Sequence, residues 1–205
     1  MKHISKISQA TTLVCALGAA CLPSLSAHAD TGTLTVKAAI ATTTCALVIG
    51  DTRDSANGSK TSYKAVNLGN LTGTNPSSVV GATFGTPKNI YFTFKNPSNL
   101  SQPCAINSTF WQVKTTLSAS QISSVANKTY LKNAVTGGTN AGVVITNAGG
   151  KEFDYSKISQ IPLTLAAGAK SSPIGVIKAQ FIHTTNTAAT AGRYNFLLPL
   201  TVTYN

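Results

Sequence analysis

The sequence predicts an all-β sandwich, and three observations favour it. Hydrophobic residues make up 42% of the 205 residues and charged residues 10%, so the chain has the apolar surface for a core and too little charge for disorder. Thr, Ser, Asn, Gly and Ala are abundant, as in short strands joined by polar turns. About eight short apolar runs are separated by turn residues. With one cysteine pair after the first 29 residues, this pattern is typical of an immunoglobulin-type sandwich.

The first 29 residues read as a secretory signal peptide. Lys2 and Lys6 form a basic start, an apolar run follows, and residues 27–29 (AHA) form a small-residue cleavage site. An uncleaved membrane anchor is the alternative, but the run is short and is broken by Pro23. We therefore expect an exported mature chain, residues 30–205, whose formal net charge falls from +11 to +9 with the loss of the two lysines.

Two cysteines, Cys45 and Cys104, remain after cleavage. In an oxidising compartment a lone pair is most simply one disulfide, which closes a loop of about 60 residues and contributes roughly 4 kcal/mol in the chain-entropy model. A metal or nucleophilic site is the alternative, but His183 is the one histidine left to assist it. We expect a structural bridge and no metal or cofactor.

Apolar and polar residues alternate before Cys45, as in a strand with one buried face. Thr33, Thr35 and Lys37 occupy the polar face of this expected strand. A second strand begins near Cys45, and residues 51–62 form a loop by every local signal. The apolar face consists of Gly32, Leu34, Val36, Ala38 and Ile40.

Further strands are expected along the rest of the chain, separated by Asn-Pro and Gly-Gly turns. Residues 118–128 are expected to form a short helix. The last strand alternates from Phe196 to Tyr204 and contains Pro199, which is tolerated mainly in edge strands. The intervening strands are expected at residues 63–71, 89–95, 108–115, 141–146, 161–165 and 174–183.

The mature chain resembles subunits of chaperone–usher fimbriae, the type 1 pilin-like family. Four features carry the resemblance: the alternating extension GTLTVKAAIATTTC, the Cys45 and Cys104 pair, the GVVITN run before a Gly-Gly turn, and a C-terminal strand. In that strand Gly192 is fourteenth from the end and Tyr204 is next to last. One departure is Ala38, because the family usually has glycine seven residues before the first cysteine.

The resemblance implies a pilin fold, an immunoglobulin-like sandwich that lacks its final strand and is completed by donor-strand complementation. Residues 30–43 would be the donor extension and residues 44–205 the pilin domain. The donor residues would be the apolar face defined above. The acceptor groove, which would also contact the chaperone, would consist of Gly192, Phe196, Leu198, Leu200, Val202 and Tyr204.

The implied function is that of a structural subunit of a surface fimbria. Its partners would be a periplasmic chaperone, an outer-membrane usher and other pilin subunits, and its location the extracellular fimbrium, where the fibre supports adhesion and biofilm formation. In the family the donor runs antiparallel to the last strand and so parallel to the first. Because four residues separate Ile40 from Cys45, we expect that the extension cannot fill its own groove in this direction.

Two other classes of function remain. A minor or adaptor pilin could itself bind a host glycan or acidic surface through its basic residues or through Trp111, although a strand tryptophan is more often buried. The lysines are spread singly, which favours a solvated surface and gives no sign of nucleic acid binding. An enzyme is disfavoured, because the sequence has no G-x-S-x-G elbow and no metal-ligand spacing.

Overall fold

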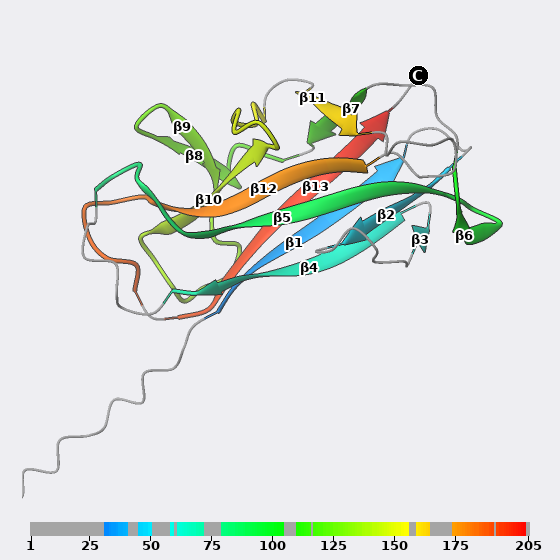
Figure 1. The fold of residues 1–205 in the computed structure, drawn as a ribbon. Helices are drawn as coiled ribbons and strands as arrows, with labels where there is room; N and C mark the ends of the chain where they lie inside the picture. The colour runs from blue at the N-terminus through cyan, green and yellow to red at the C-terminus, as the bar shows by residue number, and fades with distance from the viewer. Residues whose placement is uncertain are drawn as a thin grey trace, which may run out of the picture.

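The structure is a computed structural model of the chain. It describes residues 31–40, 45–50, 58–59, 61–71, 79–104, 110–115, 117–155, 159–164, 174–190 and 192–203. The expected signal peptide, residues 51–57 and 60 of the loop expected at residues 51–62, and Tyr204 lie outside this part. The rest of that expected loop is wrong, because residues 58–59 form a strand and residues 61–62 begin another. The described residues form thirteen strands and no helix, and these strands make two packed sheets (Figure 1). The prediction of an all-β sandwich is confirmed.

The first sheet contains both ends of the described chain. Its order is β4-β1-β13-β7-β11. The first strand therefore lies inside the sheet, between β4 and the last strand (Figure 1). The bounds are β1 Thr31–Ile40, β4 Thr61–Asn70, β7 Phe110–Thr115, β11 Ser159–Thr164 and β13 Tyr194–Thr203.

The second sheet is built around two long antiparallel strands, β5 and β12. Strand β2 pairs with the outer side of β5, and β10 pairs with the outer side of β12. Strand β11 pairs with both β7 and β12, so it links the two sheets. The bounds are β2 Ala46–Gly50, β3 Gly58–Ser59, β5 Thr83–Asn96, β6 Asn99–Pro103, β8 Ile122–Val125, β9 Lys128–Leu131, β10 Ala141–Asn147 and β12 Ile174–His183.

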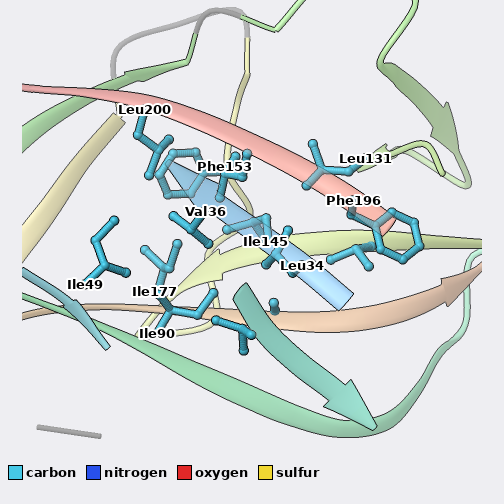
Figure 2. Packing of buried hydrophobic residues seen from close by; sticks show 14 of the residues in the cluster. Leu34, Val36, Ile49, Ile90, Leu131, Ile145, Phe153, Ile177, Phe196 and Leu200 are labelled. Carbon is cyan, nitrogen blue, oxygen red and sulfur yellow. The ribbon is translucent and has the colours of Figure 1, made fainter. Parts of the chain in front are cut away.

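The core fills the space between the sheets. Alternation places one face of each strand inward, as the BiBiBiBiBi pattern of β13 shows. Aromatic rings join the layers: Phe92 on β5 lies 4.7 Å, centroid to centroid, from Trp111 on β7. Figure 2 shows aliphatic side chains of β1, β5, β10 and β12 meeting in this layer.

Cys45 and Cys104 form the predicted disulfide, with their Cα atoms 5.8 Å apart. Cys45 precedes β2, and Cys104 follows β6. The backbone N–H of Cys104 also donates to the carbonyl of Phe94 at 3.1 Å. The bridge therefore ties the start of β2 to the end of the β5–β6 hairpin.

The short helix expected at residues 118–128 is wrong. After a turn in which Gln121 N–H donates to the Ser118 carbonyl, the chain forms the β8–β9 hairpin. Its two-residue turn, Ala126 and Asn127, has φ values of 48° and 64°. Two left-handed residues match the twist of a tight hairpin, and asparagine adopts this conformation readily. Because alanine is not a typical turn residue, the sequence did not indicate this turn.

Candidate functional site: the groove between the last strand and β4

Strand β1 fills the groove between β13 and β4, and we call it the arm. It runs parallel to β13 and antiparallel to β4 (Figure 1). The structure thus brings the predicted donor residues against the predicted acceptor residues of the same chain. Their Cα pairs are Gly32 with Tyr194, Leu34 with Phe196, Val36 with Leu198, Ala38 with Leu200, and Ile40 with Val202.

The apolar face of the arm belongs to the core. Leu34 and Val36 are both 0% exposed, whereas Lys37 on the other face is exposed. In Figure 2 both apolar side chains lie among residues of the facing sheet, including Ile145 and Ile177. Burying each aliphatic side chain contributes about 1.5–3 kcal/mol. The alternation expected from the sequence is therefore present, and it decides which face of the arm is buried.

The expectation excluded filling of its own groove by an arm that runs antiparallel to the last strand and beside the strand near Cys45. The arm instead fills its own groove in the opposite direction, parallel to β13, so the inference that it needs another subunit to pair with is wrong. The second neighbour is instead β4, and 20 residues lie between Ile40 and Thr61. The arm runs antiparallel to β4, so this pair needs no right-handed parallel crossover. Donation of Gly32–Ile40 to another subunit therefore stays a prediction.

Strand β13 is not an edge strand, although it contains Pro199. On one side Pro199 pairs with Lys37 of the arm, and on the other side the ladder with β7 begins at Leu200, which pairs with Thr115. The Thr115 hydroxyl donates to the Pro199 carbonyl at 2.9 Å. The proline therefore lies where the β7 ladder ends, next to a side-chain hydrogen bond.

The entrance to β13 is held by loop residues. The Tyr194 hydroxyl lies 2.6 Å and 2.8 Å from the carbonyl oxygens of Thr139 and Thr190. The Asn133 side chain accepts from Asn195 N–H at 2.8 Å and donates to the Arg193 carbonyl at 2.9 Å. These contacts fix the start of the strand that lines the groove.

Gly192, which was predicted to contact a chaperone or donor strand, lies just before β13. Its φ is 146°, and a Cβ there would come within 2.5 Å of Gly138 N and 2.8 Å of Gly137 C. The turn at residues 137–138 thus packs directly on this glycine. Close backbone packing explains its glycine in this structure, and a partner contact stays a prediction.

One end of the groove is narrowed by an aromatic ring. A Cβ on Gly32 would lie 2.7 Å from Cε1 of Phe181 and still closer to its Cζ. Phe181 on β12 is 2% exposed, and its ring centroid lies 5.4 Å from that of Phe84 and 6.1 Å from that of Phe196. Sequence alternation identified Gly32 as part of the arm, but nothing in it pointed to Phe181.

Trp111 is fully buried, so its ring offers no surface platform for a sugar. Its backbone strand β7 lies between β11 and β13, and a Cβ on Gly175 would come within 2.6 Å of Nε1 of Trp111. The expectation of a core tryptophan is confirmed. The alternative that Trp111 grips a glycan is wrong for this reason.

His183 ends β12 and is 1% exposed. Its ring stacks on Phe84 at a centroid distance of 4.3 Å, and neither ring nitrogen has a hydrogen-bond partner. Burial lowers the pKa of His183 below 6.5, because the charged form would lose its hydration. His183 is therefore a neutral packing residue, as expected of an ordinary strand residue.

The described residues contain no group of three or more His, Cys, Asp or Glu side chains placed to hold a metal ion. They also contain no helix long and apolar enough to cross a membrane. Tyr155 is buried, which raises its pKa, chiefly through desolvation.

Comparison with known proteins gives a limited result. No family model matches the chain, and no curated protein matches it. Among solved structures, it is similar to the CupB6 tip adhesin from Pseudomonas aeruginosa, with 12% identity and a TM-score of 0.39. The match covers 60% of this chain and 35% of the adhesin. A likeness this low carries no argument about function.

Proposed function

We propose that the chain is a structural subunit of a surface fimbria. It is exported to the periplasm and polymerised head to tail by donor-strand exchange, with a periplasmic chaperone and an outer-membrane usher as partners. In the fibre, Gly32–Ile40 of one subunit occupies the groove between β4 and β13 of the next. Adhesion and biofilm formation are then properties of the fibre.

The observation that carries this proposal is the position of the arm. It is the first described strand, it precedes the disulfide-bonded Cys45, and it supplies Leu34 and Val36 to the core. Such a strand can leave the groove without unthreading any other strand. An arm from a second copy can then enter the groove and present its alternating apolar residues to the same core, which is the logic of strand exchange between protomers.

The direction of the exchanged arm follows from the resemblance. In the fimbrial family the donor runs antiparallel to the last strand, opposite to the arm in this structure. The arm presents apolar residues at every second position. The same side chains can therefore face the groove whichever way the strand runs. The self-docked arm is then a competing state, and a chaperone strand that occupies the groove prevents it from forming.

Head-to-tail growth follows from the geometry of this contact. The arm and the groove are different surfaces of the same chain, so an exchanged contact is heterologous. Such contacts continue into a filament unless the rotation between subunits closes a ring. An empty groove would also expose the unpaired edges of β4 and β13, which is an aggregation hazard that a temporary strand removes.

The proposal is tested by deleting Gly32–Ile40 in cells that produce no other copy of the subunit. We expect a chaperone-bound subunit in the periplasm and no fibres by electron microscopy. A matched pair separates the apolar face from the arm as a whole: Leu34→Asp should abolish fibres, whereas Lys37→Asp on the exposed face should preserve them. Normal fibres from the deletion variant would refute the proposal.

A further inference from the structure

A pocket with a volume of about 270 Å³ lies on the sheet that does not contain the arm. It is lined by residues of β5, β9, β10 and β12 and by two residues after β10. Its lysines lie 50 residues apart in the sequence, Lys128 on β9 and Lys178 on β12. The pairing of β9 and β12 with opposite sides of β10 brings them together.

A bulge in β5, opposite Gln180 of β12, borders the pocket. The register between β12 and β5 shifts between Ala179 and Phe181, so Gln180 has no Cα partner on β5. The Gln180 side chain instead donates through Nε2 to the Gly85 carbonyl at 2.8 Å. Residues 85–87 of β5 lie opposite this one residue. Extra residues bend the strand that carries them, and bulges are over-represented next to functional sites.

One buried aliphatic residue and several polar side chains line the pocket. Val144 is 3% exposed, and its neighbours Val143 and Ile145 point into the core on the other face of β10. Thr146 and Glu152, joined by an isolated bridge, also line it. Six of the nine lining residues are polar or charged, so the pocket suits a polar ligand.

The charge of the pocket favours an anionic ligand. Two lysines and Glu152 give it a formal charge of +1, and the described part of the chain shows no ion pair between these three groups. The ammonium groups of the two lysines, one from each strand, can both donate to one carboxylate or sulfate. Hydrogen bonds between ionised groups are stronger than those between neutral groups. Thr146, Glu152 and the Oε1 of Gln180 can bond hydroxyl groups.

We propose that this pocket binds one acidic sugar residue, a monosaccharide unit bearing a carboxylate or a sulfate. The pocket is smaller than the range of about 300–1,000 Å³ that suits drug-sized ligands, so it suits a single ring. The site is separate from the arm groove and does not rest on the proposed function. It gives the subunit a binding activity of its own, with basic residues and without Trp111.

The test uses the purified, disulfide-bonded mature chain and nuclear magnetic resonance titration. The probes are methyl glucuronide, N-acetylglucosamine 6-sulfate and neutral methyl glucoside. We expect at least one acidic probe to shift the amide signals of β10 and β12 and to bind at least tenfold more tightly than the glucoside. The acidic probe that binds more tightly shows whether the site prefers a carboxylate or a sulfate.

Substitutions then locate the site. Lys178→Ala and Lys128→Ala should each weaken the acidic probe about tenfold, and Glu152→Gln should tighten it severalfold by removing a like charge. Lys95→Ala, at the opposite end of β5, removes the same charge elsewhere and should have no effect. No binding of either acidic probe, equal binding of the glucoside, or an equal loss in Lys95→Ala would overturn the proposal.

Discussion

Gly32 of the arm lies directly against the ring of Phe181 on β12, with no room for a side chain between them. The ring is held from its other sides by Phe84 and Phe196. This contact sets the position of the arm along the groove, because a shift by two residues would bring Leu34 to the ring.

Substitution of Gly32 should therefore loosen the arm. We expect Gly32→Val to reduce the free energy of unfolding by about 1–3 kcal/mol, the usual cost of overpacking a core. Chemical denaturation measures this loss. Gly149→Ala is the control, since its Cβ would meet nothing closer than the Asn147 side chain at 3.4 Å. In Phe181→Leu the cost of Gly32→Val should shrink by at least half, and equal costs in both backgrounds would exclude the contact.

The two faces of the arm should respond differently to truncation. Val36→Ala removes a buried side chain and should cost about 1–3 kcal/mol, whereas Lys37→Ala on the exposed face should change the free energy of unfolding by less than about 0.5 kcal/mol. Denaturant titration of the two variants provides the comparison. Similar small effects at both positions would show that the arm is not docked.

The disulfide should contribute strongly to stability. It joins residues 59 apart, for which chain entropy predicts about 4 kcal/mol. The double variant Cys45→Ala/Cys104→Ala should lose most of this amount, as urea unfolding would show. Addition of a reducing agent should lower the stability of the native chain and leave the double variant unchanged. A loss below about 1 kcal/mol would contradict a structural role for the bridge.

His183 should make stability depend on pH. Its pKa is lowered in the folded chain, so the unfolded chain binds the proton first as the pH falls below about 6.5. The contribution of neutral His183 is thus complete above that pH and is lost below it, by up to about 1.4 kcal/mol per pH unit. Unfolding curves between pH 7.5 and 5 should show this slope. In His183→Leu the slope should flatten, and an unchanged slope would assign it to other groups.

Much of the fold is readable from local patterns. The period of two in Gly32–Ile40 and in Phe196–Val202 identified two strands, the faces they bury and, with the resemblance, their adjacency. The cysteine pair was identified by number alone. What local patterns could not supply is direction, because an alternating strand presents the same face when it is reversed. The mistaken neighbour of the arm, β2 in place of β4, was a matter of long-range topology.

Other features depend on residues distant in sequence. The pocket lysines, Lys128 and Lys178, are brought together only by strand pairing with β10. The ring of Phe181 limits the arm through a contact that no sequence spacing encodes. The hairpin turn at Ala126 and Asn127 was missed because alanine is a helix former and seldom occupies a left-handed position.

The central claim is that the groove between β4 and β13 is completed by a strand that can be exchanged. The most direct measurement is calorimetric binding of a synthetic peptide of residues 31–40 to a mature chain that lacks those residues. We predict one peptide per chain and a rise in melting temperature, or folding that occurs only when the peptide is present. A scrambled peptide should do neither. A truncated chain as stable as the full chain and indifferent to the peptide would contradict the account.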